Sequence, residues 1–362
     1  MRLKALLLSL AVAASQIVHA QNIGKTGVLP PSRDQFLATF GGYIDALRIQ
    51  AGIPGLAGAI VGDTDLLWQQ AFGYQDLGAS VLTRTDTVFQ FDGLSQLITA
   101  TMVMQCVEQG KTTLDAPIGA YTPSSLDANA TVGQILSHTS GTPGNLTFFY
   151  NTKRLDALMF VVETCTGLTF RQAFSRTLEQ LGMMESLPGP DAALPELKNS
   201  DVAPPATAAR YRSVLNRLAT PYSVSGTGAA TSSEYGVKTL EAASGLVSTV
   251  LDFAKYDLAL KRGVLLHGDT LNTAWHTPEN SNGQTLPHAL GWFVQSYNGE
   301  PVVWQFGVQP NASSSLVVTL PARNLTLILV ANSDGLAKPA SLSVGDVTVS
   351  PFAKVFLGLV VR

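Results

Sequence analysis

Apolar residues recur at two different spacings in the first part of the chain, and each spacing predicts a different element. From Asp34 to Leu47, phenylalanine, leucine, tyrosine and isoleucine recur every three to four residues, which predicts an amphipathic helix. Residues 56–61 and 66–74 are rich in strand-forming residues and flank a polar turn, so they predict a β-hairpin. The chain is therefore expected to begin with one helix followed by two strands.

The middle of the chain is predicted to be mostly helical. Its helical segments are separated by short stretches rich in proline, glycine, serine, threonine and asparagine. The clearest helical patterns cover residues 99–110, 155–165 and 250–260. Residues 203–233 are rich in small side chains, and we expect them to form a loop.

Strand patterns return near the C-terminus. They cover residues 302–305, 314–320 and 325–330, and a last helix starts at about Pro351. Strands at both ends of the chain therefore bracket a helical middle. We expect an α/β (α+β) fold with one antiparallel sheet flanked by terminal helices, built from residues 34–95 and 240–362, and a mostly helical inserted region over residues 96–239.

The start of the chain has the pattern of a secretory signal peptide over residues 1–20. A basic start, an apolar run over residues 5–18 and small residues around Ala20 fit this pattern. The run is too short to span a bilayer comfortably. We expect cleavage near Ala20, export to the periplasm or beyond, a leader over residues 21–33, and no membrane span.

Composition refines this picture only slightly. Apolar residues make up 46% of the chain, and the net charge is −3. A sizeable core can form, and no basic face suggests nucleic-acid binding.

Cys106 and Cys165 both lie in apolar segments with a helical pattern. Export permits a disulfide between them, but buried free thiols are an equally good interpretation.

A series of short motifs extends over most of the chain. The sharpest is Leu-Ser-His-Thr-Ser-Gly at 136–141, and others are Ile-Pro-Gly-Leu at 53–56, Leu-Gly-Met at 181–183, Gly-Leu-Val-Ser-Thr at 245–249 and Leu-Gly-Trp at 290–292. Their order resembles the serine β-lactamase and penicillin-binding-protein superfamily, above all class C β-lactamases, D-alanyl-D-alanine carboxypeptidases and related esterases. The resemblance implies a β-lactamase/transpeptidase-like fold and an active site with three conserved motifs.

The first motif of that active site is S-x-x-K, which places serine and lysine one helical turn apart so that the amine assists serine deprotonation. The flanking residues put Gly93 at the serine position and Gln96 at the lysine position. Glycine has no side chain, and neutral glutamine is not a comparable proton acceptor. No lysine of the chain has a serine three residues before it, so the pair is absent in every register. Ser95 is rotated by roughly 200° from the position of Gly93 on the same helix.

The other two motifs are also altered. The counterpart of Y-x-N keeps its tyrosine as Tyr150 but has Thr152 at the asparagine position, unless a one-residue loop change brings Asn151 there. The counterpart of K-T-G or H-x-G begins at Gln305, and it keeps only the glycine, Gly307. Tyr150 is either a retained site residue or a packed aromatic side chain.

Other chemistry finds less support. The histidines have no metal-ligand spacing, and no phosphate loop or dinucleotide fingerprint follows a strand, so we expect no metal and no cofactor. We expect His138 to hydrogen bond to the backbone. Asp92 is interpreted as a carboxylate stabilised by the N-terminus of the following helix, with a new acid or base as the alternative.

Two functions fit these observations. The first is a non-catalytic binding or scaffolding protein, a pseudoenzyme whose cleft holds a cell-wall fragment, a small ester or a protein partner. The second is an active esterase, peptidase or β-lactamase that uses non-standard residues such as Tyr150 or Ser95. The first is favoured because loss of the serine alone costs roughly a millionfold in kcat in an unrelated hydrolase. The residues expected to line the cleft are Gly93, Gln96, Tyr150, Thr152, Gln305 and Phe306.

Overall fold

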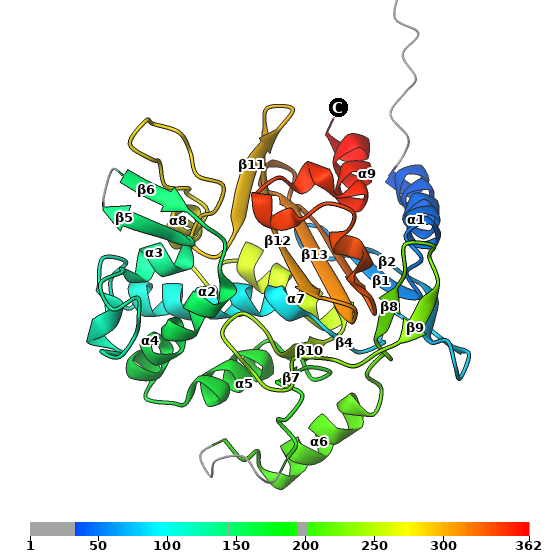
Figure 1. The fold of residues 1–362 in the computed structure, drawn as a ribbon, viewed down its shortest axis with the longest axis horizontal. Coiled ribbons are helices and arrows are strands. Elements are labelled where there is room, and N and C mark those ends of the chain that lie inside the picture. The colour runs from blue at the N-terminus through cyan, green and yellow to red at the C-terminus, as the bar shows by residue number, and fades with distance from the viewer. Residues whose placement is uncertain (1–32, 143–144, 195–200, 362) are drawn as a thin grey trace, which may run out of the picture.

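A seven-stranded antiparallel sheet forms the centre of the computed structural model, which describes residues 33–142, 145–194 and 201–361 (Figure 1). The predicted signal peptide and residues 21–32 of the predicted leader lie outside these ranges. Strands from both ends of the chain are neighbours, because Leu56 pairs with Ala331. In spatial order the strands are β11 (Phe293–Tyr297), β12 (Glu300–Gln309), β13 (Ser313–Leu320), β14 (Leu325–Ala331), β1 (Gly55–Val61), β2 (Leu66–Asp76) and β3 (Val81–Leu82).

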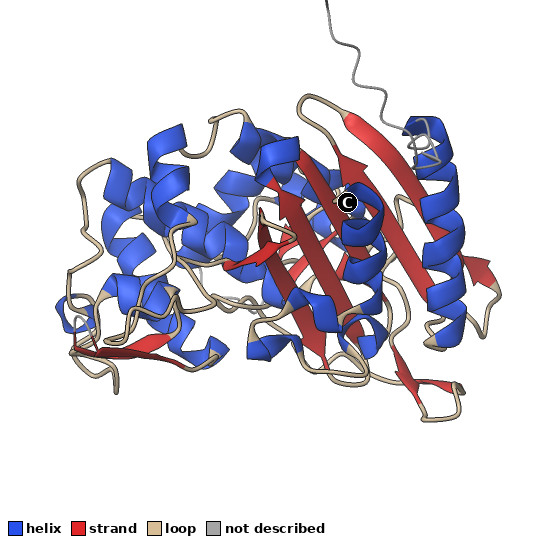
Figure 2. Ribbon diagram, turned by 90° about the horizontal axis from the view of Figure 1, so that it is seen from above, coloured by secondary structure: helices blue, strands red, loops and turns tan. Residues whose placement is uncertain are grey.

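Both faces of the sheet are covered, and strand β1 shows how. Its side chains alternate between the two faces, as in any strand. Leu56 and Ile60 belong to one core cluster with residues of α1 and α9, whereas Ala57 and Val61 belong to a second cluster with residues of α7. Figure 2 shows two helices crossing one face of the sheet. The three covering helices are α1 (Arg33–Gln50), α7 (Val250–Lys261) and α9 (Pro351–Val360).

The remaining helices gather beside the sheet. Helix α5 begins with a capping box in which the Thr169 side chain accepts from Gln172 and the Gln172 side chain accepts from Thr169. No helix in the described ranges is long and apolar enough to cross a membrane. These helices are α2 (Ser95–Glu108), α3 (Val132–Leu136), α4 (Ala157–Thr166), α5 (Phe170–Gln180), α6 (Pro205–Leu215) and α8 (Gly268–Ala274).

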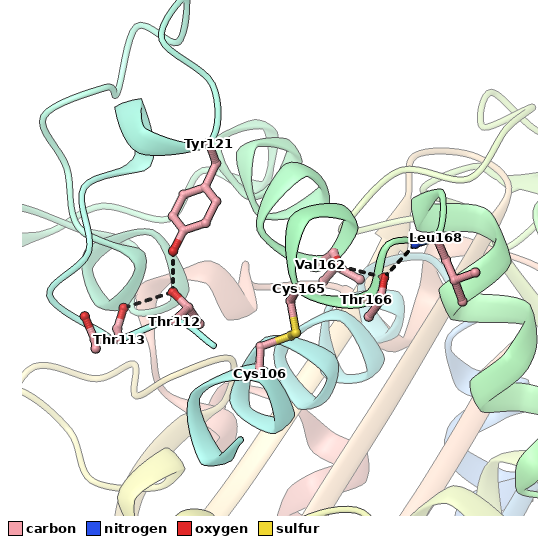
Figure 3. The surroundings of a disulfide bond; sticks show 8 residues. All are labelled: Cys106, Thr112, Thr113, Tyr121, Val162, Cys165, Thr166 and Leu168. Atoms are coloured by element: carbon pink, nitrogen blue, oxygen red, sulfur yellow. Dashed lines mark hydrogen bonds between the residues drawn. A yellow bond between two sulfur atoms is a disulfide. The ribbon is translucent and has the colours of Figure 1, made fainter. Parts of the chain in front are cut away.

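A disulfide joins two of these helices, which decides between the two interpretations of the cysteines. Cys106 on α2 and Cys165 on α4 are bonded, with their Cα atoms 6.0 Å apart (Figure 3). That spacing is within the usual range for disulfides. The free-thiol interpretation is therefore wrong, because the packing of α2 against α4 brings together two cysteines that are 59 residues apart in the sequence.

The expectation of a loop over residues 203–233 is also wrong. Helix α6 occupies Pro205–Leu215, and a short hairpin follows it. Pro205 is suited to the first turn of a helix, and Tyr211 and Val214 are buried in a small cluster of their own. The small residues at 206–209, in the first half of the helix, hid this periodicity. The hairpin consists of β8 (Tyr222–Val224) and β9 (Ala230–Ser232).

A small second sheet leads the chain into the candidate site. Strand β4 (Phe89–Gln90) pairs with β10 (Leu246–Ser248), which also pairs with β7 (Leu187–Pro188). A 3₁₀ turn, η1 (Asp92–Leu94), follows β4, and α2 then starts at Ser95, four residues earlier than predicted. A further hairpin of β5 (Thr139–Thr142) and β6 (Asn145–Phe148) lies close to α3.

Candidate functional site

The structure brings the three altered motifs together where η1, the start of the 3₁₀ turn η3 (Thr152–Asp156) and strand β12 meet. Gly93 belongs to η1, Tyr150 precedes η3, and Gln305 lies on β12. Phe306 belongs to the core cluster that also contains residues of α1 and α9, and Tyr150 packs against this cluster; the two rings stack with centroids 5.4 Å apart. The positions that correspond to the three motifs in the sequence are therefore neighbours in the fold.

Gly93 is packed directly against the backbone of β12. A Cβ atom at Gly93 would lie 3.0 Å from the Cα of Gly307 and still closer to the carbonyl oxygen of Phe306. The contact is mutual, because a Cβ at Gly307 would lie 2.6 Å from the backbone nitrogen of Gly93. No side chain fits at either glycine unless the backbone shifts. The place where a serine would start is therefore occupied by main chain.

Gln96 is fully buried and holds two partners. Its Nε2 donates to the hydroxyl of Tyr150 at 3.0 Å, and its Oε1 is 3.3 Å from Nε2 of His138. The backbone N–H of Asn151 donates to Nδ1 of His138 at 3.2 Å, which confirms the expected backbone contact of this histidine. Nδ1 must then be the acceptor, so the imidazole proton is on Nε2 and is donated to Gln96.

Gln305 is also buried and turned into the protein. Its Nε2 donates to the carbonyl oxygen of Gly291 at 3.1 Å and lies 3.3 Å from Nε2 of His288. Its Oε1 accepts from the backbone N–H of Phe306 at 2.9 Å. His288 donates from Nδ1 to the carbonyl oxygen of Ala289 at 2.8 Å. The position that resembles the family's lysine or histidine is therefore a neutral amide with its polar atoms satisfied.

The titratable groups of this network are uncharged at neutral pH. Burial, together with the nearby charge of Arg154, lowers the pKa of His138 to about 3. Burial lowers the pKa of His288 well below its usual range. Burial also raises the pKa of the Tyr150 hydroxyl to about 12, against a small opposing effect of its hydrogen bond with Gln96. None of the three is poised to exchange a proton near pH 7.

The remaining sequence candidates have structural roles. The Ser95 hydroxyl is buried, donates to the carbonyl oxygen of Asp92 at 2.8 Å and accepts from the backbone N–H of Leu246 at 3.0 Å. The Asn151 side chain caps η3 by accepting from the backbone N–H of Lys153. The Ser95 side chain is fully buried and therefore not available to a substrate in this arrangement. Thr152, in contrast, faces a cavity.

This cavity has a volume of about 300 Å³ and lies beside Gly93 and Tyr150. It differs from the cleft expected from the sequence, because Gln96 and Gln305 do not line it. The two glutamines are buried behind it, where their amides bond to histidine, tyrosine and backbone groups. The lining residues are Asp92, Gly93, Tyr150, Thr152, Lys153, Val237, Glu241, Ala243, Ser244, Phe306, Val308, Gln309 and Pro310.

Asp92 is the residue whose environment the sequence analysis missed. It is 2% exposed, and its carboxylate accepts from Nε2 of Gln309 at 3.0 Å and from the hydroxyl of Ser313 at 2.6 Å. Burial raises its pKa to about 6. The expected interaction with the N-terminus of α2 is absent, because Asp92 is the first residue of η1, three residues before α2 begins, and its carboxylate bonds to side chains of β12 and β13. No local sequence signal indicates this arrangement.

A surface ion pair also lines this cavity. Nζ of Lys153 is 2.8 Å from a carboxylate oxygen of Glu241, and Ser244 donates to the same carboxylate at 3.0 Å. The Lys153 side chain is 70% exposed, so the pair belongs to the mouth of the cavity. In the described ranges, no group of three histidine, cysteine, aspartate or glutamate side chains could hold a metal ion.

Known proteins place this architecture in a family. The sequence profile of the family described as Beta-lactamase matches residues 40–343, so the chain belongs to that family. A stretch of 131 residues is 39% identical to penicillin-binding protein 4 of Amycolatopsis lactamdurans, and this match spans 34% of each protein, about a third of the relative's length. The predicted membership of the serine β-lactamase and penicillin-binding-protein superfamily is confirmed.

Solved structures support the same fold. The octameric penicillin-binding protein homologue from Pyrococcus abyssi superposes with a TM-score of 0.67 at 18% identity, covering 82% of this chain and 74% of that one. The crystal structure of SurE superposes with a TM-score of 0.65 at 22% identity, covering 91% of this chain and 75% of that one. At these identities the likeness concerns the fold alone, and it confirms the predicted α/β class.

Proposed function

We propose that this protein is an exported, non-acylating member of the β-lactamase family that acts by binding a ligand or partner. The observation that carries the proposal is the contact between Gly93 and strand β12. It leaves neither a hydroxyl nor room for one at the position where the family's nucleophile begins. A covalent acyl-enzyme needs that oxygen, whereas reversible binding does not.

The surroundings of Gly93 support the same proposal. Gln96 and Gln305 are neutral, and each is held by hydrogen bonds that a catalytic lysine could not make in the same way, because an ammonium group has no acceptor. The cavity beside Gly93 remains, and its volume of about 300 Å³ is at the lower end of the range for small-molecule sites. Ligand binding is thus compatible with the packing that disfavours acylation.

The alternative, a hydrolase with unorthodox residues, has weaker support. Ser95 is buried and hydrogen bonded to backbone on both sides. Tyr150 lines the cavity, but its raised pKa makes its hydroxyl a poor nucleophile and a poor base at neutral pH. The only side chain that contacts its hydroxyl by a hydrogen bond in the described ranges is the amide of Gln96, which cannot accept its proton.

Activity-based labelling tests the proposal directly. The mature protein is incubated with a fluorescent penicillin and with a fluorophosphonate, and an active family member serves as the positive control. We expect no covalent label, and no turnover of nitrocefin or a p-nitrophenyl ester above buffer. A label that survives denaturation would overturn the proposal. Loss of that label in Tyr150→Phe would then favour the hydrolase.

Non-covalent ligands should be tested next. The Amycolatopsis relative is named for penicillin binding, so an intact penicillin and cell-wall fragments are the first probes for a reversible shift in melting temperature. Export is tested separately, by sequencing the N-terminus of protein recovered from the periplasm or medium. We expect it to begin at Gln21, immediately after the predicted cleavage site.

A further inference from the structure

The cavity beside Gly93 contains a buried negative charge without a positive partner. Asp92 has no ion pair with any residue in the described ranges, and its two hydrogen-bond donors, Gln309 and Ser313, are neutral. Each carboxylate oxygen has acceptor capacity beyond its single donor. Buried carboxylates are normally paired or coordinated, since an isolated one is costly to desolvate. The cavity is therefore prepared for a cationic group.

The positive charge at the mouth does not supply this partner. Lys153 is already matched by Glu241, with the two charged groups 2.8 Å apart. When Asp92 is ionised, the three charged lining groups sum to one negative charge. Gln305, at the position of the family's positively charged motif, is neutral and faces away from the cavity. The electrostatics thus favour a cation over an anion.

The remaining walls suit an apolar body. Phe306 and Tyr150 stack with each other and both line the cavity, and Val237, Val308 and Pro310 complete its apolar lining. Aromatic ring faces attract cations as well as apolar groups. A small organic amine would place its ammonium group at the carboxylate and its hydrocarbon part against these side chains.

We propose that the cavity binds a small organic cation, a protonated amine with an apolar or aromatic body, and that the Asp92 carboxylate is its main recognition group. The inference rests on the proposed binding function and specifies the ligand class of the same site. A lysine-containing motif at this place in the family would attract an anion, whereas the cavity of this protein would bind a cation.

The test compares three probes of similar shape and different charge. Benzylamine, benzyl alcohol and benzoate are titrated by calorimetry into the wild type, Asp92→Asn and Asp252→Asn. Asp252 is the matched control because it is also 2% exposed but lies outside the cavity. Asn is close in shape to Asp, so Asp92→Asn removes the charge. The Asn amide can still hydrogen bond to both Gln309 and Ser313.

We expect the wild type and Asp252→Asn to prefer benzylamine over benzyl alcohol by roughly tenfold to a hundredfold, the value of a charge-assisted hydrogen bond. The preference should disappear in Asp92→Asn. A variant-free check uses the wild type alone, whose affinity for benzylamine should fall as the pH decreases below about 6, when Asp92 becomes protonated. Benzyl alcohol should show no such fall.

The results that would overturn this inference differ from those against the proposed function. Tighter binding of benzoate, equal affinities in the wild type and Asp92→Asn, or no binding of the amine would each overturn the assignment of a cation site. None of these outcomes affects the proposal that the protein does not acylate. That proposal depends on covalent labelling, which is measured on the same preparation.

Discussion

The carbonyl oxygen of Phe306 occupies the space in which a side chain at Gly93 would start. Two segments that are more than two hundred residues apart in the chain thus exclude a nucleophile by main-chain contact. The clash occurs at the Cβ atom, so any residue other than glycine at position 93 would meet it. The sequence lacks the S-x-x-K motif, and the fold in addition leaves no space for its serine side chain at position 93.

Restoring the serine alone should therefore destabilise the protein. We expect Gly93→Ser to lower the free energy of unfolding by roughly 1–3 kcal/mol, the usual cost of overpacking, and to leave the protein unlabelled by a fluorescent penicillin. Urea unfolding measures the effect. Gly42→Ser is the control, because Gly42 is exposed on α1 and a Cβ added there would meet no other atom within 4 Å, so its effect should stay within about 0.5 kcal/mol. A stable, labelled Gly93→Ser protein would contradict this account.

Adding the lysine should not rescue acylation. In Gln96→Lys, the ammonium group would lie in a buried site and the Nε2–H of His138 would lose its acceptor. We expect the double variant Gly93→Ser/Gln96→Lys to be less stable than Gly93→Ser and equally free of label. Gln109→Lys, the same change at an exposed position of the chain, should be near neutral. Stoichiometric labelling of the double variant would show that the cavity opens easily.

Loss of the disulfide should cost substantial stability. Cys106 and Cys165 close a loop with a sequence separation of 59, for which chain entropy suggests about 4 kcal/mol. We expect Cys106→Ala/Cys165→Ala to unfold at a lower urea concentration than the wild type. The free energy of unfolding from these curves should fall by about 4 kcal/mol. Thiol titration of the denatured wild type should give no reactive thiol without reductant. Two titratable thiols in that experiment would contradict the bond.

The Asp92 carboxyl should make stability fall as the pH rises. Its folded-state pKa of about 6 lies above its ordinary value of 3.8, so the folded state binds the proton more tightly than the unfolded state. The stabilisation is complete below pH 3.8 and is lost as the pH passes 6. The groups in the described ranges that donate to this carboxylate, Gln309 and Ser313, are neutral. Tyr235, whose pKa is raised chiefly by burial and also by Asp92, is a titratable group coupled to it, and Lys153 and Glu241 line the same cavity.

The Asp92→Asn variant isolates this effect. Relative to the variant, the wild type should lose about 2 kcal/mol of unfolding free energy between about pH 4.5 and pH 7.5. Urea unfolding at both pH values gives the difference, which cancels the titration of other groups. An equal difference at the two pH values would mean that the folded-state pKa of Asp92 is not raised.

The two buried histidines should remain neutral over the physiological range. Burial lowers the pKa of His138 to about 3 and that of His288 well below normal. Two imidazole resonances should therefore keep constant NMR chemical shifts between about pH 5 and pH 8, and His138→Asn should remove one of them. Asn tolerates the positive φ of this position. Titration of the assigned His138 resonance near pH 6.5 would contradict its burial.

Local pattern was sufficient for much of the fold because the relevant forces act between near neighbours in sequence. Strand-forming residues over 56–61 and 66–74, with a polar turn between them, predicted the hairpin that became β1 and β2, and the final helix begins at Pro351 as expected. The motifs also located Gly93, Gln96, Tyr150 and Gln305 in one region, because their flanking residues resemble the family. The absence of a serine–lysine pair required no structure.

What the sequence could not provide depends on which distant segments meet. The disulfide follows from the packing of α2 on α4, and helix α6 follows from the burial of Tyr211 and Val214 in a separate cluster. The environment of Asp92 arises from partners on strands more than two hundred residues away. Sequence alone determined that the serine and lysine of the S-x-x-K motif are absent. The tertiary structure decided that the backbone of β12 fills the space beside Gly93 where the serine side chain would lie. It also left a carboxylate unpaired beside the cavity, because burial and close approach are properties of packed segments and not of residue order.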